Sequence, residues 1–510
     1  MAEKDQTLQA ALQAACLRHG QREAFRFPER SLSFAELDDA AGRCAAGLAA
    51  LGARPRERVA IMAPTCPELL VAHLGVQWLG GVRVPLNPGL TGDELAFLLR
   101  DAAPAAAIVG EPQSAAHGAL LQSLGIRCVV IGAAAPPDPS FAELLSRAAP
   151  APPVHQGRAD EPALLFYTSG TTGRPKGALL SHRNVLSGVE RLINAWRWSG
   201  DDRFLLALPL FHVHGLGVGV HGALLTGCLT IVRPRFRAAE DLACLARERC
   251  TLFMGVPAMY YDLVHLPDDQ ARDLGRMRLF ISGSAALPIT TFAAFEKRYG
   301  HRILERYGAT ETMLTISNPY DGERRPGSIG LPLPGVEVRV VDEAWRDVPN
   351  GTPGELLIRS ESVFLGYHNL PEATAEAVRD GWFASGDIGL REPDGYLRIL
   401  DRKKNLVISG GFNIYPAEVE NVLRRHAGVR DAAVVGLPDE RLGEVVAALV
   451  VPSESAATAE ELLTFCGAHL ARYKQPRRLH FAPDLPRNAM GKVDARAVRR
   501  LLAEEVSRQA

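Results

Sequence analysis

One stretch of this chain constrains its fold and its ligand more than any other, a glycine-rich and hydroxyl-rich run at residues 167–177. The run reads YTSGTTGRPKG, with four aliphatic hydroxyls, three glycines and one lysine, and it follows the apolar segment 163–166. We predict that this segment is a short buried strand. Glycines allow turns that bring backbone N–H groups together, while the hydroxyls and Lys176 add donors and positive charge. The run therefore predicts a phosphate-binding loop, and the ligand that it favours is a nucleotide.

The loop differs from the P-loop of ordinary NTPases. Gly170 would need a Gly-Lys pair five residues later, but Pro175 stands there, and Lys176 precedes Gly177 where a P-loop has Ser or Thr. A surface loop that merely links two elements is the alternative for such a run taken alone.

Sequence patterns around the loop predict an α/β fold. Segment 59–62 is typical of a strand, 68–79 of a helix and 82–84 of a second strand, which together indicate a parallel α/β layer. Similar short apolar runs recur at 105–109 and 128–131.

The length and one charged patch predict two domains. A chain of 510 residues exceeds the usual size of a single core. The patch 401–405 follows an apolar strand, and beyond it we expect a helix that begins at Pro416 and a strand at 432–435. We therefore predict a large N-terminal domain of layered α/β sheets over residues 1–400, joined by a hinge to a smaller C-terminal α+β domain over 401–510.

Composition narrows the classes of partner. A formal net charge of -1 and 23% charged residues give no electrostatic bias toward nucleic acid. No segment approaches about 18 uninterrupted apolar residues, and residues 1–10 lack an apolar stretch. We therefore expect no membrane span and no signal peptide, and we expect a cytoplasmic location. Eight cysteines lie without a C-x-x-C pair, which indicates small core residues and no zinc site.

Two acidic segments are candidates for nucleotide contacts. Segment 306–312 places Glu311 beside a hydroxyl and a glycine, and a magnesium ion that bridges phosphates takes one or two such carboxylates. Segment 381–389 places Asp387 between apolar residues, where ribose hydroxyls would offset the cost of burying a carboxylate. A solvated loop for the first and a turn or cap for the second are the alternatives.

Two further segments have more than one interpretation when each is taken alone. Segment 486–493 carries Lys492 after a glycine, where an exposed lysine is the alternative. Segment 217–222 matches G-x-G-x-x-G, but the strand 229–232 ends at Arg233 and not at an acidic residue, so we interpret it as close helix packing. We expect core or pocket roles, and no metal site, for three histidines, namely His212, His214 and His221.

In order and spacing, these pieces resemble the motifs of the adenylate-forming acyl-CoA synthetase superfamily over nearly the whole chain. The matching segments are 167–177, 281–285, 306–312, 381–389, the hinge at 401 and Lys492. The resemblance implies an acid–thiol ligase in which a carboxylate attacks the α-phosphorus of MgATP, pyrophosphate leaves, and coenzyme A then attacks the acyl-adenylate. ATP, Mg²⁺ and coenzyme A are thus the expected cofactors and co-substrates.

The same resemblance assigns roles to individual residues. The catalytic group would be Lys492, Glu311, Thr168 and His212, with Thr168 and Glu311 holding the metal. ATP would contact Thr168, Ser169, Gly170, Thr171, Thr172, Gly173, Lys176, Gly283, Ser284, Ala285, Arg306, Tyr307, Gly308, Ala309, Thr310, Asp387, Arg402 and Lys492. The small domain would rotate about Asp401, and CoA would meet Lys404, Gly410 and Gly411.

Within the superfamily, segments 211–215, 281–285 and 317–322 are most similar to malonyl-CoA synthetases. A dicarboxylate needs a cation for its distal end. The expected acyl-binding residues are His212, His214, Ser282 and either Arg235 or Arg278. A medium-chain or aromatic acid–CoA ligase, a stand-alone adenylation enzyme that loads a carrier protein, and a nucleotide-binding regulator without catalysis are the alternatives. We expect a monomer or homodimer.

Overall fold

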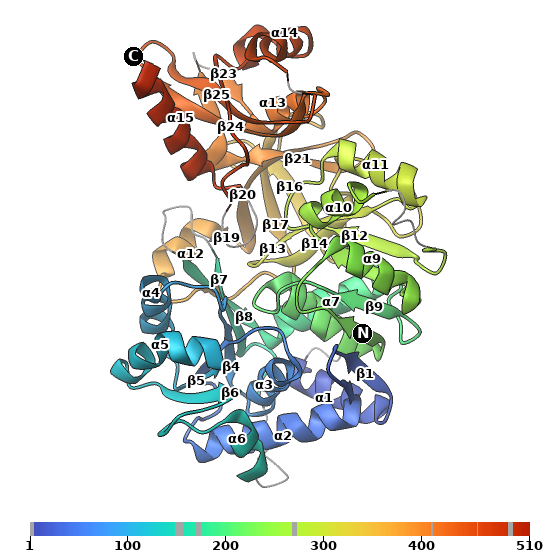
Figure 1. Ribbon diagram of the computed structural model, residues 1–510, viewed down its shortest axis with the longest axis vertical. Helices are drawn as coiled ribbons and strands as arrows, with labels where there is room; N and C mark the ends of the chain where they lie inside the picture. Colours follow the sequence, from blue (N-terminus) through green and yellow to red (C-terminus); the bar gives the residue numbers. More distant parts are fainter. Residues whose placement is uncertain are drawn as a thin grey trace.

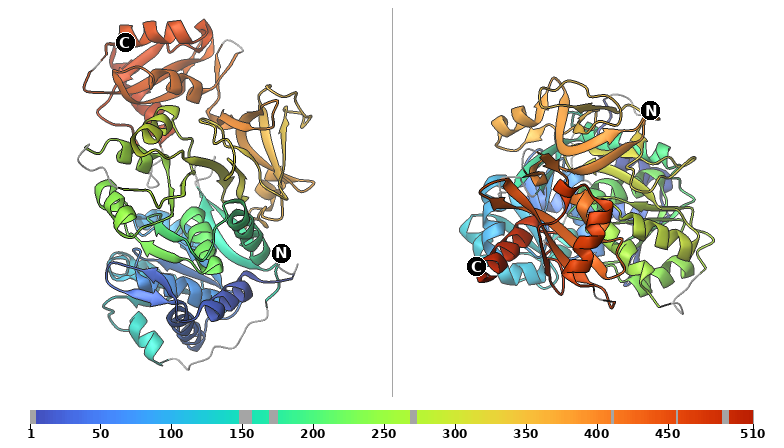
Figure 2. Two further views of the ribbon diagram at one scale, coloured as in Figure 1. Left: turned by 90° about the vertical axis from the view of Figure 1, so that its right-hand side faces the viewer. Right: turned by 90° about the horizontal axis from the view of Figure 1, so that it is seen from above.

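The computed structural model shows a large lobe and a smaller C-terminal lobe stacked along the long axis of the molecule (Figure 1). A side view keeps the small lobe at one end, above the large lobe (Figure 2). The structure describes residues 5–147, 157–168, 175–267, 273–409, 412–455, 457–487 and 493–509.

The first sheet of the large lobe carries the strands that flank the phosphate loop. Its order is β18-β8-β7-β4-β3-β5-β6. The central strands β7, β4, β3, β5 and β6 run parallel, while β8 and β18 are antiparallel to their neighbours. The bounds are β3 (Arg58–Met62), β4 (Val82–Pro85), β5 (Ala106–Gly110), β6 (Arg127–Ile131), β7 (Pro162–Thr168), β8 (Lys176–Ser181) and β18 (Gly366–Tyr367).

A second sheet follows the order β15-β14-β13-β12-β11-β9-β10-β1-β2. Its strands from β13 to β1 run parallel, so their carboxyl ends meet at one edge. The bounds are β1 (Glu23–Arg26), β2 (Ser31–Ser33), β9 (Arg203–Leu206), β10 (Leu229–Val232), β11 (Leu252–Gly255), β12 (Leu279–Ser282), β13 (Leu304–Ala309), β14 (Met313–Ser317) and β15 (Leu331–Pro332).

Helices cover these sheets and share one core with them. The largest cluster of buried apolar side chains contains Ile61 and Leu164 of the first sheet together with Phe204 of the second. Burial of this continuous apolar surface is the main force that holds the two sheets together. The helices are α1 (Leu8–His19), α2 (Phe34–Ala50), α3 (Pro67–Trp78), α4 (Gly92–Ala102), α5 (Glu111–Ser123), α6 (Phe141–Arg147), α7 (His182–Ala195), a π-helix (Val213–Val220), α8 (His221–Thr226), α9 (Ala238–Arg247), α10 (Pro257–Val264), α11 (Ile289–Tyr299) and α12 (Pro371–Ala377).

A third, smaller sheet leads from the large lobe into the C-terminal lobe. It contains β16 (Glu337–Val341), β17 (Gly354–Arg359), β19 (Val378–Arg379), β20 (Trp382–Arg391) and β21 (Leu397–Arg402). The C-terminal lobe then packs a fourth sheet with helices, and its two apolar clusters contain residues of this lobe alone. Its elements are β22 (Val407–Ser409), β23 (Phe412–Ile414), α13 (Pro416–Leu423), β24 (Val429–Asp439), β25 (Gly443–Pro452), α14 (Ala459–His469), β26 (Arg478–Phe481) and α15 (Ala495–Gln509).

A single carboxylate ties the connection between the lobes to the small lobe. Asp401 lies in β21, and its side chain accepts hydrogen bonds from the backbone N–H of Arg402 at 2.6 Å and from Asn405 Nδ2 at 3.1 Å. Its other oxygen accepts from the backbone N–H of Ala417 in α13 at 2.9 Å. Because the first N–H groups of a helix lack partners inside the helix, Asp401 satisfies one of them from outside.

The predicted fold class is confirmed, with a large N-terminal α/β body and a smaller C-terminal body. The exact boundary at residue 400 stays a prediction. Segment 217–222 packs closely as expected, because a Cβ on Gly222 would lie 2.2 Å from the Trp198 ring. Seven cysteines are buried and Cys66 is half-buried. Along the described part of the chain, no helix has the length and apolar character that a membrane crossing requires.

Candidate active site

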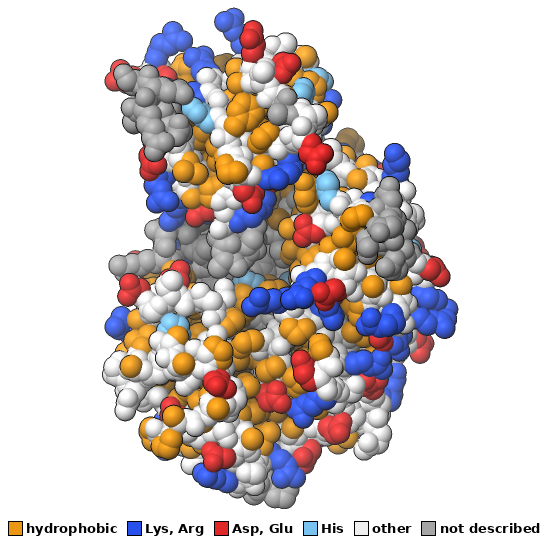
Figure 3. Space-filling view, viewed as in Figure 1, with side chains coloured by type: hydrophobic (Ala, Val, Ile, Leu, Met, Phe, Trp, Pro, Cys, Tyr) orange, Lys and Arg blue, Asp and Glu red, His pale blue; other side chains and the backbone are white. Residues whose placement is uncertain are grey.

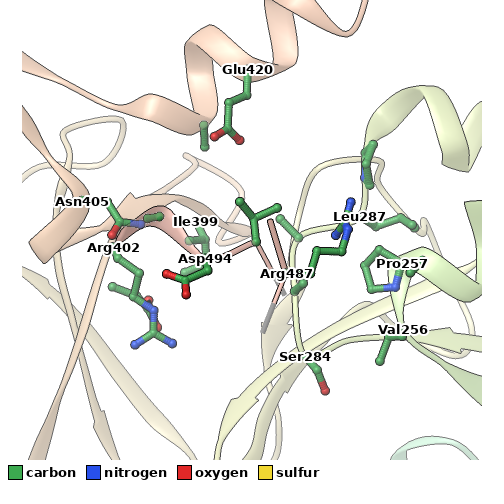
Figure 4. Close-up of a pocket in the computed structure, with 18 of the residues that line it drawn as sticks. Val256, Pro257, Ser284, Leu287, Ile399, Arg402, Asn405, Glu420, Arg487 and Asp494 are labelled. Atoms are coloured by element: carbon green, nitrogen blue, oxygen red, sulfur yellow. Dashed lines mark ion pairs between the residues drawn. The ribbon is translucent and has the colours of Figure 1, made fainter. Parts of the chain in front are cut away.

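Both lobes line one large cavity of about 3780 Å³. The surface is hollowed where the lobes meet (Figure 3). In the close-up, Ser284, Val256 and Pro257 come from the large lobe, whereas Glu420 and Asp494 face them from the C-terminal lobe (Figure 4). The carboxyl ends of parallel strands open toward this space, which is the usual position of ligand sites in α/β sheets.

The two strands that flank the predicted phosphate loop form a hairpin at the cavity. Thr168, the last residue of β7, pairs with Lys176, the first residue of β8. Both line the cavity. Ser181 ends β8 and begins α7, where its hydroxyl and Asn184 form a reciprocal capping box. Strand pairing fixes the base of the loop, and the cap anchors the far end of β8.

A buried carboxylate on β20 sits opposite an arginine on β21. Asp387 and Arg402 are cross-strand partners, and the Asp387 Oδ1–Arg402 Nε distance is 2.6 Å. The hydroxyl of Tyr307 donates to the other Asp387 oxygen at 2.5 Å. The aspartate is only 3% exposed, so these two donors offset much of its desolvation. All three side chains line the cavity.

A second carboxylate, Glu311, follows β13. Its Oε1 accepts a hydrogen bond from the hydroxyl of Tyr367 at 3.0 Å, and its backbone C=O accepts from Phe364 N–H at 2.7 Å. Burial raises the pKa of Glu311 above the usual value of a glutamate. In the described chain, no lysine or arginine lies within ion-pair distance of Glu311, so its charge is open to a bound cation.

The lining of the cavity includes a buried cation. Arg306 is 4% exposed, and no hydrogen-bond partner of its Nε and Nη2 is found in the described chain. Its guanidinium lies against Gly283, where a Cβ would stand 2.3 Å from Arg306 Cζ. Nearby, the His214 Nδ1–Ser284 Oγ distance is 3.4 Å, and burial holds the pKa of His214 well below its ordinary value. Arg306 therefore brings two buried donors to the wall of the cavity.

Two protein-family models match this chain, in agreement with a nucleotide site between the two lobes. The model of the AMP-binding enzyme family matches residues 12–368, and that of the AMP-binding enzyme C-terminal domain matches residues 418–492. The chain belongs to the AMP-binding enzyme family. The expected adenylate-forming, AMP-forming acid–CoA ligase is confirmed at this level, and use of ATP and CoA agrees with it.

Relatives of this AMP-binding enzyme match along nearly its whole length. Indoleacetate–CoA ligase of Aromatoleum aromaticum is 38% identical over 488 residues, which cover 94% of this chain and 95% of the relative. Feruloyl-CoA synthase of an Amycolatopsis species is 37% identical, with the same coverage. ATP-bound MatB from Rhodopseudomonas palustris superposes with a TM-score of 0.91 at 37% identity, covering 97% of this chain and 99% of that structure.

Most described residues that the motifs select meet in the cavity of this AMP-binding enzyme. Those that line it are Thr168, Lys176, His212, His214, Ser284, Ala285, Arg306, Tyr307, Gly308, Ala309, Thr310, Glu311, Asp387, Arg402 and Lys404. Gly283 lies behind Arg306, and Asp401 lies at the connection. The predicted residues outside the described part of the chain are Ser169, Gly170, Thr171, Thr172, Gly173, Gly410, Gly411 and Lys492.

Three predicted acyl contacts lie elsewhere. Arg278 precedes β12 and so lies at the opposite end of this strand from the cavity, where it pairs with Asp202 at 2.6 Å. Arg235 is exposed and lines a separate cavity of about 360 Å³. Ser282 is fully buried at the end of β12 and is absent from the described lining of the large cavity. Neither proposed arginine is therefore among the described residues that line the large cavity.

Sequence reasoning missed two features of the site. The assignment of Arg306 to ATP stays a prediction, but the sequence did not indicate that Arg306 lies on a strand, β13, whose adjacent side chains alternate between its faces. Tyr367 was not selected at all, because it meets Glu311 and Lys176 only through tertiary pairing. Gly283, which directly follows β12, leaves room for the guanidinium of Arg306.

The neighbour of Arg306 gives a pH-dependent prediction. Glu305 is buried, one carboxylate oxygen accepts from Leu287 N–H at 2.9 Å, and the other is without a partner in the described chain. Burial raises its pKa to about 8. The folded protein therefore keeps a proton that the unfolded chain loses above about pH 4.5, and stability falls as pH rises toward 8. Glu305→Gln keeps the acceptor without titrating, so it should be more stable than wild type by roughly 2 to 4 kcal/mol at pH 8.

Thermal unfolding between pH 5 and 8.5 measures this difference, which should shrink toward the acidic end. The control is Glu36→Gln, because bonds from Ser33 lower the pKa of the exposed Glu36 and give the opposite trend. A Glu305→Gln advantage that is the same at pH 5 and pH 8 would contradict the prediction.

Proposed function

We propose that this enzyme activates malonate or a similar short dicarboxylic acid and transfers it to CoA. The observation that carries the proposal is Arg306, a buried cation whose Nε and Nη2 lack partners in the described chain. Burial lowers its pKa to about 9, which leaves it charged at pH 7. A guanidinium binds a carboxylate through two parallel hydrogen bonds, and a distal carboxylate supplies the missing partner.

The surroundings of Arg306 support the same acid. A buried unpaired cation is costly, so a substrate with a second carboxylate gains from entering this position. His214 and Ser284 stand nearby, and His214 Nε2 is also buried without a partner in the described chain. The resemblance of segments 211–215, 281–285 and 317–322 to malonyl-CoA synthetases also supports the proposal, and the chain is 37% identical to ATP-bound MatB.

The cavity supplies groups for two successive steps. In the first, the acid's carboxylate attacks the α-phosphorus of ATP and pyrophosphate leaves, and in the second the CoA sulfur attacks the acyl carbon and AMP leaves. Asp387 with Arg402 would hold the ribose, while Ser284, Ala285 and Tyr307 would line the adenine. His212 also lines the cavity and would contact the acid.

The remaining proposed roles belong to cations and to the C-terminal lobe. Lys176 would contact phosphate oxygens, and Lys492 would bridge the carboxylate and the α-phosphate during adenylation. Rotation of the C-terminal lobe about Asp401 would then bring Gly410 and Gly411 toward the CoA path, with Lys404 near it. One cavity would thus serve both steps.

The donor set fits a magnesium ion. A Mg²⁺ ion that bridges phosphates takes only one or two protein carboxylates and completes its coordination with phosphate oxygens and waters. It therefore needs no cluster of three or more His, Cys, Asp or Glu side chains, and none suitable for a metal is found among the described residues. Glu311 and the hydroxyl of Thr168 line the cavity and would hold it. When bound, the ion neutralises charge on the phosphates. Glu311 and Thr168 themselves orient the phosphate end of the nucleotide.

An aryl acid is the second candidate substrate. The relatives named for indoleacetate and ferulate are 38% and 37% identical to this chain. Apolar side chains such as Met259, Val256 and Leu314 also line the cavity. These walls would suit a ring, but they leave the Arg306 donors unsatisfied.

A panel of acids tests the proposal. CoA-dependent AMP release is measured with malonate, methylmalonate, propanoate, indoleacetate and ferulate, and reactions without CoA or without acid are the controls. We expect kcat/KM for malonate to exceed that for propanoate by about 100-fold or more, because only the dicarboxylate pairs with Arg306. Turnover of aryl acids alone would favour the second candidate and refute the first.

A further inference from the structure

One tyrosine, Tyr367, contacts two oppositely charged residues that line the cavity, Lys176 and Glu311. The Nζ of Lys176 lies over the Tyr367 ring, 5.0 Å from its centroid. The hydroxyl of the same tyrosine donates to Glu311 Oε1 at 3.0 Å. Lys176 closes the phosphate loop and Glu311 is the proposed metal carboxylate, so Tyr367 stands between a cation and an anion that both serve MgATP.

The backbone around Tyr367 holds the ring in this position. Strand β18 pairs Tyr367 with Ala178 of β8, and His368 N–H donates to the Gly177 C=O at 2.7 Å. The N–H of Tyr367 donates to Thr374 Oγ1 in α12 at 2.8 Å. On its other side the ring packs edge-on against Phe364, with centroids 4.8 Å apart. The ring is therefore fixed from the sheet, the helix and the neighbouring aromatic.

The two contacts of Tyr367 are weaker than an ion pair between Lys176 and Glu311 would be. A lysine and a glutamate in a partly buried cavity attract each other strongly if they can meet, and that pair must be broken before phosphate and metal bind. A cation over an aromatic face and one neutral hydroxyl donor are weaker contacts, which a phosphate oxygen and a metal ion replace at lower cost.

We propose that Tyr367 is a positioning residue that keeps Lys176 and Glu311 from pairing with each other, so that both stay available to MgATP. The inference rests on the proposed use of MgATP at this site. Tyr367 takes no part in bond making. Its effect is exerted through the lysine and the carboxylate, and it is measured in ATP binding without any acid or CoA.

Three variants separate the two contacts of Tyr367, with ATP affinity measured by calorimetry over a range of magnesium concentrations. Tyr367→Phe keeps the ring under Lys176, so magnesium-free ATP binding should stay within about 3-fold of wild type while the magnesium requirement rises about 3- to 10-fold. Tyr367→Leu loses both contacts and should weaken ATP binding about 10- to 100-fold. Adding Glu311→Gln to Tyr367→Leu removes the competing anion and should restore most magnesium-free binding.

Tyr396→Leu is the matched control. Tyr396 carries Arg325 over its ring at 4.0 Å and donates from its hydroxyl to a backbone oxygen, yet it is absent from the described lining of the cavity. This variant should bind ATP like wild type. Wild-type ATP affinity in Tyr367→Leu, or a double variant no better than Tyr367→Leu, would overturn the inference alone. A wild-type enzyme that binds no ATP would overturn the proposed function as well.

Discussion

Replacing Lys492 with alanine is expected to reduce acyl-adenylate formation by about three orders of magnitude or more, which corresponds to roughly 4 kcal/mol of transition-state stabilisation. Negative charge gathers around the α-phosphorus while a carboxylate approaches it. A lysine carried by the C-terminal lobe would stabilise that charge by position alone. Pyrophosphate exchange dependent on the acid measures this step, and ATP binding should survive because Lys176, Asp387 and Arg402 remain.

The second half-reaction serves as an internal control for Lys492. Thioester formation from pre-made acyl-adenylate and CoA should change by less than about tenfold, since the proposed rotation of the lobe would by then have removed the lysine from the reaction centre. Lys474→Ala is the matched variant, because Lys474 belongs to the same lobe but pairs with Glu418 at 2.7 Å. Unchanged adenylation in Lys492→Ala would refute the assigned role.

Arg306→Met is expected to lower kcat/KM for malonate by about 1000-fold, because the distal carboxylate would then be buried without a partner. Propanoate lacks that carboxylate, so its turnover should change little or rise, and the preference between the two acids should invert. The fold should persist, since a methionine fills the space of a buried cation that has no acidic partner in the described chain. Steady-state kinetics with both acids measure the inversion.

Arg235→Ala is the control for this experiment. Arg235 carries the same charge as Arg306, and the sequence analysis proposed it for the distal carboxylate. It is exposed and lines the separate small cavity. The kinetics of Arg235→Ala with malonate should therefore stay as in wild type. Parallel losses of malonate turnover and ATP affinity in Arg306→Met would contradict the assignment, because they would place the arginine at the nucleotide.

The fold could be predicted where local pattern determines structure. The strand at 229–232 matches β10, and the helix at 68–79 differs from α3 by one residue at each end. A turn or cap around Asp387 is the alternative that the sequence leaves open for segment 381–389, yet β20 runs through it. Pairing with β17 and β21 supplies backbone hydrogen bonds that no local pattern of glycine and aspartate reveals.

The candidate site, like the fold, could be predicted only in part. Motif positions such as Glu311 and Asp387 could be selected because a few residues adjacent in sequence identify them. The cation proposed for the acyl end could not be selected, since Arg278 and Arg306 look alike in sequence and differ in their places relative to the strands. Tyr367 lies far along the chain from Lys176, and only the β18–β8 pairing brings them together.

The two apolar clusters confined to the C-terminal lobe make that lobe a modular unit. An exchange of lobes between relatives would leave both interiors intact, and the choice of junction would then decide whether the hybrid works. A splice placed between Asp401 and Ala417 would join a carboxylate from one parent to a helix start from the other. A junction on the amino-terminal side of β21 would transfer the carboxylate together with the helix that it caps.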